Sequence, residues 1–599
     1  MPRSSAPARS APPLLRLILP ALVAALSFAA FLPALGGPFL AWDDDVNLLE
    51  NTGFRGLGLT QLRYMFTTTL LGHYIPLTWV SFGVNYALGG MDPWGYHLGN
   101  LLLHAASAAI VYFIARRLLA AAFAGGVAEA GDGRGDASIA VGAAFAALAW
   151  GVHPLRVESV AWITERRDVL CGVFCALAVL AYLRGVAGGG AIETRWWAAS
   201  VAAFALSLLS KASSMPLPAV LVLLDVYPLR RPARVGWPRL LVEKAPHAAL
   251  ALGAAGLAAA AQWSARAVTG YAEYGVGARI AMTAYGLVFY PWKLLWPVDL
   301  SPLYELPPRV DPLAWRFLGS ALALVIATAV LVAARRALPG ALAAWVYSAL
   351  LVLPVSGLVV HAGVQLVSDR YAYLSSLGFA VLAGGGLAWL LRARARVRPA
   401  VVGAGALAAA LVVAGWGAGA WRQSHLWRDS EALWRRAVAV EPDCAVCNLN
   451  LGAVLVDRAP GDPGRAAEAE ARFRLAIARR PDRALAYHGL GVSLALQRRY
   501  GDAEAAFLEY ARREPGSAIA SIDLGLLRLA QRRPGDAIPH LRRALAISPS
   551  APVAAELERA LREHAEELRR GGRPAGVERP AAGPEGPRAG QRPGTTTAR

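Results

Sequence analysis

Long apolar runs alternate with short charged segments over the first part of the chain, up to about residue 424. A helix needs about 20 apolar residues to cross the hydrocarbon core of a bilayer, and runs of about that length recur here. The pattern predicts an all-α polytopic membrane domain over residues 1–424 with eleven spans. These are 14–35, 96–118, 139–152, 169–186, 196–210, 214–229, 245–263, 312–334, 340–360, 372–391 and 399–421. The stretch 279–296 is predicted to be an interfacial helix that does not cross.

From Trp427 onward the apolar positions follow the period of soluble helix pairs. The residues Leu490-Gly491, Ala503, Phe507 and Pro515 recur 34 residues later as Leu524-Gly525, Ala537, Leu541 and Pro549. An earlier copy, Leu451-Gly452, Phe473, Ala476 and Pro481, carries extra residues near 459–464. This period, with Leu-Gly, a small Ala and a terminal Pro, is the tetratricopeptide signature. We therefore predict tetratricopeptide repeats over 425–570, and a disordered tail, rich in Gly, Pro and Arg, over 571–599.

Composition and charge are those of a membrane protein. Of the 599 residues, 56% are hydrophobic and 17% charged, and the mean hydropathy is +0.41. The net charge of +19 comes largely from arginine runs between apolar runs, without the interleaved aromatics of a nucleic-acid-binding face. By the positive-inside rule, the runs 230–234, 335–336 and 392–398 lie in the cytoplasm. The expected location is the cytoplasmic (inner) membrane, with the repeats on the external, periplasmic side.

Three adjacent carboxylates follow the first apolar run, in the sequence Trp42-Asp43-Asp44-Asp45. They belong to the first external segment, residues 37–95. Ionisable clusters beside a bilayer are costly unless they face water or a polar cavity, so they mark functional sites by default. Asp43, Asp44 and Asp45 are therefore candidate catalytic residues. The alternative is a solvated loop with an acidic cap on the next helix.

Basic side chains on the external side go against the general charge bias, and they gather in short motifs. Beside external carboxylates they suit an anionic, lipid-linked substrate, because cations hold phosphate. The candidate phosphate-binding residues are His153, Arg166, Arg167, Lys211, Lys293 and Arg370. The alternative is that these cations are interfacial snorkelling residues paired with Glu158, Glu165, Asp168 and Asp369.

Several motifs together resemble one known family. They are Trp42-Asp43-Asp44-Asp45 with Asn51, His73 to Trp79, Tyr96-His97-Leu98 to Asn100 with His104, His153 to Trp162, and Glu165-Arg166-Arg167-Asp168, followed by the repeats. The chain is similar to the transmembrane and tetratricopeptide repeat-containing O-mannosyltransferases of the glycosyltransferase C superfamily, as a bacterial-type member. Its resemblance covers nearly the whole chain except the tail. On this basis Glu158, Asp168, His73 and His97 are expected to support the site.

The resemblance implies a multi-span enzyme that takes mannose or another hexose from a polyprenyl-phosphate carrier. The acceptor would be a Ser or Thr hydroxyl of an exported protein, recruited through the repeats. Family members commonly place the catalytic acidic residue in the first external loop, which matches Asp43 to Asp45. A carboxylate would remove the hydroxyl proton during an inverting displacement, while cations offset charge on the leaving phosphate. Three carboxylates could hold a divalent ion, but no second ligand set is visible, so neither a metal nor a cofactor is predicted.

Two other functions are compatible with parts of the sequence. A membrane-anchored tetratricopeptide scaffold or assembly factor would rely on the repeats alone. A lipid-linked sugar transporter would also use intramembrane charges, but matching Gly/Pro breaks in repeat-related spans are not found. Neither alternative explains why carboxylates and cations collect on the external face.

The four cysteines form two pairs in the sequence. Cys171 and Cys175 lie inside an apolar run and are expected to be packed there. Cys444 and Cys447 form a lone CxxC motif, which predicts either a disulfide, if the compartment is oxidising, or two packed thiols. Without a second pair or a nearby His, this motif does not indicate a zinc site.

Overall fold

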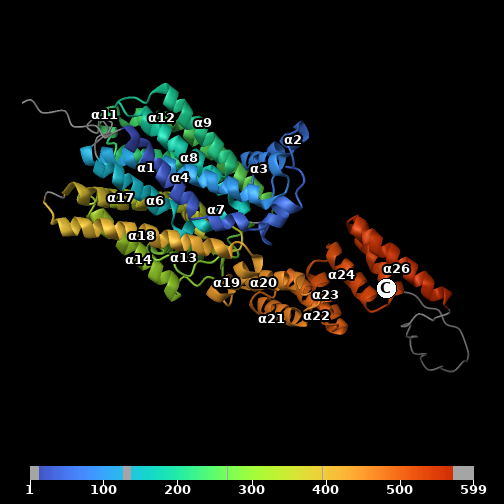
Figure 1. Ribbon diagram of the computed structural model, residues 1–599. Helices are drawn as coiled ribbons and strands as arrows, with labels where there is room; N and C mark the ends of the chain where they lie inside the picture. The colour runs from blue at the N-terminus through green and yellow to red at the C-terminus, as the bar shows by residue number, and fades with distance from the viewer. Residues whose placement is uncertain (1–12, 126–136, 266–267, 394–395, 571–599) are drawn as a thin grey trace, which may run out of the picture. The chain divides into compact units, whose positions relative to one another are not determined.

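A computed structural model describes residues 13–125, 137–265, 268–393 and 396–570 (Figure 1). The described chain is mostly helical, as predicted. It divides into two compact units, Met1–Val454 and Leu455–Arg599. Outside the described residues lie 1–12, 126–136 and the predicted disordered tail, 571–599.

The first unit is a bundle of helices (Figure 1). Its helices are α1 (Pro13–Ala29), α2 (Leu59–Thr67), α3 (Pro76–Gly89), α4 (Pro93–Ala124), α6 (Ala137–Gly151), α7 (Val157–Ala161), α8 (Arg166–Gly185), α9 (Thr194–Ser210), α10 (Leu217–Val226), α11 (Pro232–Val235), α12 (Trp237–Ser264), α13 (Val276–Leu295), α14 (Trp315–Ala333), α15 (Pro339–Val352), α16 (Ala372–Ser375), α17 (Leu377–Arg392), α18 (Pro399–Leu426) and α19 (Ser430–Val440). Helix α20 (Ala445–Asp457) contains the division between the units.

Local sequence signals account for the bounds of the longest helix, α4. Its N-cap Asp92 accepts a hydrogen bond from the Trp94 amide, and Pro93 occupies the first helical position. It ends at Gly125, which adopts the left-handed conformation that closes many helices. Where α6 crosses α17, Gly142 and Gly384 lie back to back, and a Cβ on either would overlap the other's carbonyl oxygen. Small residues at such crossings let helix backbones approach closely.

The predicted count of eleven membrane spans is not confirmed. Four helices in the described ranges are long and apolar enough to cross a bilayer: Pro93–Ala124, Ile163–Gly185, Trp315–Ala333 and Pro399–Leu426. Two bent pairs, Ala137–Gly151 with Pro154–Ala161 and Asp369–Ser375 with Leu377–Arg392, raise the number to six if each pair is one span. The other predicted spans form helices that are shorter, or that carry charged residues, as α12 does.

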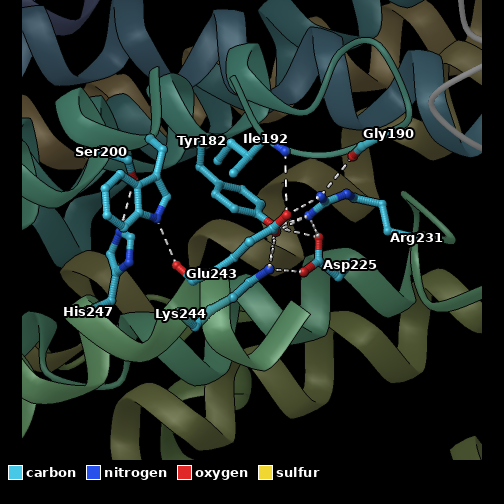
Figure 2. A network of polar contacts seen from close by, with 10 residues as sticks. Tyr182, Gly190, Ile192, Ser200, Asp225, Arg231, Glu243, Lys244 and His247 are labelled. Atoms are coloured by element: carbon cyan, nitrogen blue, oxygen red, sulfur yellow. Dashed lines mark hydrogen bonds and ion pairs between the residues drawn. The ribbon is translucent and has the colours of Figure 1, made fainter. Parts of the chain in front are cut away.

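A buried charge cluster joins α8, α10 and α12 (Figure 2). Arg231 contacts Asp225 at 3.0 Å and Glu243 at 2.9 Å, and Lys244 pairs with both carboxylates. The Tyr182 hydroxyl lies among them, donating to Asp225 at 2.6 Å and accepting from Arg231 at 2.6 Å. Arg231 belongs to the arginine run 230–234, which the positive-inside rule places in the cytoplasm. In the structure its side chain is fully buried and paired with carboxylates.

Short antiparallel strands pair the segments that connect the later helices. The strands β1 (Val268–Thr269) and β3 (His361–Ala362) pair antiparallel, as do β2 (Tyr304–Glu305) and β4 (Gln365–Val367). The buried Arg279 of α13 donates to the carbonyls of Thr269, Tyr274 and Gly357, at 2.7, 3.0 and 2.9 Å. Arg279 therefore ties α13 to β1 and to the segment before β3.

The first unit extends past the predicted domain boundary at residue 424, because α19 packs on the first external segment. Trp434 stacks on Trp42 with 4.4 Å between ring centroids, and the Ser430 hydroxyl accepts a hydrogen bond from the Ala41 amide at 2.9 Å. Cys444 and Cys447 are joined in a disulfide just after α19, which confirms one of the two predicted states. Cys171 and Cys175 are free and buried in α8.

The second unit is a stack of helix pairs. Its helices are α21 (Pro463–Arg479), α22 (Ala484–Leu496), α23 (Tyr500–Arg513), α24 (Ala518–Ala530), α25 (Pro534–Ile547) and α26 (Ala551–Arg569). The Leu-Gly positions of the 34-residue period fall in α22 and α24, the first helices of successive pairs. A Cβ on Gly491 would overlap the Phe507 ring, so glycine is required for the two helices of the pair to approach.

Candidate active site

The three adjacent carboxylates of the first external segment have different environments. Asp44 is fully buried: its Oδ2 accepts from the Leu40 amide at 2.9 Å, and its Oδ1 accepts from the amide and hydroxyl of Thr164 at 3.0 and 2.6 Å. Burial raises the pKa of Asp44 to about 6. The two hydrogen bonds from Thr164 tie the external segment to the turn before α8, so Asp44 has a structural role.

Asp45 and Asp43 are both half-buried, but only Asp45 is tied to the backbone. Asp45 begins a short π-helix, Asp45–Leu49, and accepts from the Val46 amide at 2.8 Å. Asp43 makes no hydrogen bond with any described residue of the chain. Burial raises its pKa, which Arg167 and Arg370 act to lower. Of the three carboxylates, Asp43 is the one with neither oxygen hydrogen-bonded to a described residue.

A cluster of buried charges lies beside Asp43, and Glu165 is its centre. Arg167 Nη2 lies 2.6 Å from Glu165 Oε1, Lys211 Nζ lies 2.8 Å from Oε2, and Arg370 Nε lies 3.4 Å from Oε1. We call Glu165, Arg167, Lys211 and Arg370 the cation cluster. Its basic side chains come from the start of α8, from the residue after α9 and from the turn Asp369–Tyr371. Three cations from distant segments therefore converge on one carboxylate.

Further carboxylates balance the cation cluster. Lys211 also contacts Asp168 Oδ1 at 2.6 Å, and Arg370 pairs with Glu158. The Arg370 amide donates to Glu158 Oε2 at 2.8 Å. The predicted pairing of the external cations with acidic residues is thus present for three of them. They are buried together, however, and do not snorkel separately to the interface.

His73 is positioned by a tight turn. Leu70 and His73 bridge across a two-residue turn in which Leu71 and Gly72 have φ of 49° and 73°, a conformation that glycine adopts at little cost. Burial, together with the nearby charges of Arg167 and Lys211, holds the pKa of His73 well below its usual range. His73 is therefore a neutral hydrogen-bonding group at the edge of the cation cluster.

Other predicted site residues have their polar atoms engaged within the protein. Arg166 donates to Asn85 Oδ1 at 2.9 Å, to the Tyr96 carbonyl at 2.6 Å and to Asn100. His153 accepts from the Leu155 amide at 3.2 Å, and its Nε2 lies 3.1 Å from the Leu294 carbonyl.

Two more predicted site residues lie apart from the cation cluster. Lys293 donates to the Val298 carbonyl at 2.6 Å and lies over the rings of Phe289 and Tyr304. His97 is fully buried in α4. These contacts engage the ammonium group of the half-buried Lys293 without a phosphate ligand, whereas both ring nitrogens of His97 lack a hydrogen-bond partner among the described residues.

The sequence did not single out two residues that organise the site. Glu165 stood in the motif Glu165-Arg166-Arg167-Asp168 only as a possible partner of the cations. The ring centroids of Trp42 and Trp162 lie 5.1 Å apart, and Trp42 also stacks on Trp434. These contacts fix the backbone next to Asp43. In the sequence, the signal that could have identified Glu165 as a site residue is its place as a carboxylate inside a basic motif. Among the described residues, no group of three His, Cys, Asp or Glu side chains is arranged to hold a metal ion.

Comparison with known proteins confirms the predicted resemblance. A tetratricopeptide repeat family model matches residues 461–518 and 497–552. Protein O-mannosyl-transferase Tmtc2 of Drosophila melanogaster is 34% identical over 213 residues, which is 34% of this chain and 21% of that protein. Protein O-mannosyl-transferase TMTC2 of Homo sapiens is 31% identical over 219 residues, 35% of this chain and 24% of that protein. The chain thus spans between a fifth and a quarter of the length of these curated relatives.

Among solved structures, ArnT from Cupriavidus metallidurans bound to undecaprenyl phosphate aligns with a TM-score of 0.34. Its sequence is 16% identical, and the alignment covers 84% of this chain and 80% of that one.

Proposed function

We propose that this chain, a homologue of proteins named protein O-mannosyl-transferases, is a membrane glycosyltransferase. It transfers mannose or another hexose from a polyprenyl-phosphate carrier to Ser or Thr hydroxyls of exported proteins. The observation that carries the proposal is Asp43, a carboxylate with no hydrogen-bond partner among the described residues, on which the buried Arg167 and Arg370 of the cation cluster act. An acceptor hydroxyl needs a base, and a departing phosphate needs positive charge.

Asp43 is the proposed general base. Its raised pKa makes it a stronger base than an ordinary aspartate. It removes the proton of the acceptor hydroxyl as the oxygen attacks the anomeric carbon, and the bond from that carbon to the carrier phosphate breaks. The reaction inverts the anomeric configuration through an oxocarbenium-like transition state.

The cation cluster is the proposed phosphate site. Arg167, Lys211 and Arg370 are already held by carboxylates, so they need little reorganisation when charge builds on the leaving phosphate. Glu165 holds their spacing and keeps their summed charge compatible with burial. Asp44 positions the segment that carries Asp43, so it contributes to geometry and does not touch the substrate.

The test compares two neighbouring carboxylates in the full chain. Asp43→Asn should lower sugar transfer by about 10²- to 10⁴-fold, the usual contribution of a general base. Asp45→Asn is the matched control and should retain most of the activity, because Asp45 contacts the Val46 amide and no cation. Transfer is read from the mass added to an acceptor peptide, and folding from the melting temperature. Full transfer by folded Asp43→Asn would refute the assignment, and an absence of transfer by the unmodified chain would favour a scaffold or transporter.

The repeats are proposed to recruit the acceptor. Leu485 in α22 and Ile519 in α24 occupy equivalent positions, 34 residues apart, and their side chains are 54% and 40% exposed. Repeat arrays bind peptides on the surface formed by such equivalent positions. Tethering the acceptor raises its effective concentration, so weak binding suffices.

The recruitment proposal is tested with serine substitutions. Leu485→Ser with Ile519→Ser should raise KM for a protein acceptor while leaving kcat for a short peptide unchanged. Leu508→Ser, at an exposed site on the second helix α23, is the control. Equal KM values for all variants would show that the exposed apolar positions do not recruit.

A further inference from the structure

An apolar groove runs between α9 and α12 in the first unit. It has a volume of about 350 Å³, and its walls include Leu208 and Leu209 of α9 and Leu250, Gly253 and Leu257 of α12. Its lining on α12 extends from Ala249 to Gln262, which is about 20 Å along the helix. The groove is therefore long enough to cover much of one hydrocarbon chain in the bilayer.

One end of the groove is polar. His73, Lys211 and Gln262 line that end, and Gln262 packs against Gly72 of the tight turn. Lys211 is 8% exposed, and its ammonium group contacts Glu165 at 2.8 Å and Asp168 at 2.6 Å. Lys211 thus belongs both to the groove and to the cation cluster, so the polar end of the groove opens toward the proposed phosphate site.

We propose that this groove holds the apolar chain of the lipid-linked sugar donor, with the donor phosphate at Lys211. The inference rests on the proposed function and adds the position of the carrier chain. An apolar wall ending in a buried cation complements a long hydrocarbon chain ending in a phosphate. A water-soluble sugar phosphate or sugar nucleotide would leave the apolar walls without a partner. The neutral His73 offers a hydrogen bond to the phosphate oxygens at the same end.

Two glycines of α12 provide a matched pair of variants. A Cβ on Gly253 or on Gly256 would meet no atom within 4 Å, so both positions accept a larger side chain. Gly253 lines the groove, whereas Gly256 does not. Replacing either with phenylalanine removes a helix-weakening glycine, so both variants should fold alike. Only Gly253→Phe places a ring in the groove.

The experiment measures binding of polyprenyl phosphates without sugar to the purified full chain in detergent micelles. Gly253→Phe should weaken binding of a long-chain polyprenyl phosphate at least tenfold, because the ring displaces several buried methylene groups. Gly256→Phe should leave it unchanged. Geranyl phosphate, with two isoprene units, is too short to reach Gly253, about 14 Å along α12 from Gln262. Its affinity should be equal in both variants.

A second arm tests the polar end. The unmodified chain should prefer long-chain polyprenyl phosphate to the uncharged polyprenol, and Lys211→Gln should lose this preference while keeping the dependence on chain length. Equal effects of Gly253→Phe and Gly256→Phe would overturn the groove assignment. Equally tight binding of a diacyl phosphatidate would also overturn it, because the groove would then be a general lipid site.

The outcomes separate this inference from the proposed function. If the two glycine variants bind alike but Asp43→Asn still abolishes transfer, the groove is wrong and the transferase stands. If the unmodified chain binds no polyprenyl phosphate, both proposals fail.

Discussion

The substitution Glu165→Gln tests the electrostatic coupling between Glu165 and Asp43. Glu165 is the carboxylate shared by Arg167, Lys211 and Arg370. The amide keeps the shape of the side chain and removes its charge. Lys211 and Arg370 retain Asp168 and Glu158 as partners. Arg167 loses its only close carboxylate among the described residues, and Asp43 is then its nearest negative charge.

The loss of the Glu165 charge changes two quantities, the pKa of Asp43 and the stability of the chain. Glu165 raises the pKa of Asp43 while Arg167 lowers it, so the loss of Glu165 lowers the pKa of Asp43. A base with a lower pKa stays ionised in more acidic solution but accepts a proton less readily. The acid limb of the pH–rate profile should therefore move to lower pH, and kcat should fall. Breaking a buried ion pair from one side also costs about 3–5 kcal/mol of stability.

The assay is kcat against pH for the unmodified chain and the variant, with melting temperatures measured in the same buffer. Glu193→Gln is the control, because Glu193 and Arg195 form an exposed pair at 3.1 Å. An exposed pair contributes only about 0–1 kcal/mol, so this variant should change neither readout. A folded Glu165→Gln variant with an unmoved acid limb would refute the electrostatic coupling between Glu165 and Asp43.

Three further predictions concern stability and topology. Because burial raises the pKa of Asp44 from 3.8 to about 6, stability from this group is present at low pH and lost as the pH rises through about 6. Asp44→Asn should flatten that decline, worth about 3 kcal/mol, in melting curves between about pH 3 and pH 7, and a parallel decline in the variant would contradict this. Asp225→Asn leaves Arg231 and Lys244 with Glu243 alone and should destabilise the chain by about 3–5 kcal/mol in thermal melts, whereas no change would show that the cluster is not structural. Reporter fusions after residues 50 and 500 should read external and one after 233 cytoplasmic; a cytoplasmic reading at 500 would separate the repeats from the proposed active site.

Local patterns determined much of this protein. The 34-residue period placed the Leu-Gly positions of α22 and α24 correctly, because helix pairs stack through contacts that recur at fixed spacing. Apolar runs separated by charged segments correctly predicted helices throughout the first unit. The Glu165-Arg166-Arg167-Asp168 motif also located part of the charged site, since charge is costly beside apolar runs and is retained there for a reason.

Tertiary structure alone decided which of these residues meet. Asp43, Asp44 and Asp45 are equivalent in the sequence, yet only folding places Thr164 against Asp44 and leaves the oxygens of Asp43 free. Arg166 and Arg167 are neighbours, but successive residues on a helix point about 100° apart, so one binds Asn100 and the other Glu165. Charged residues such as Glu243 and Lys244 of α12 find their partners inside the bundle, and no local pattern records those partners.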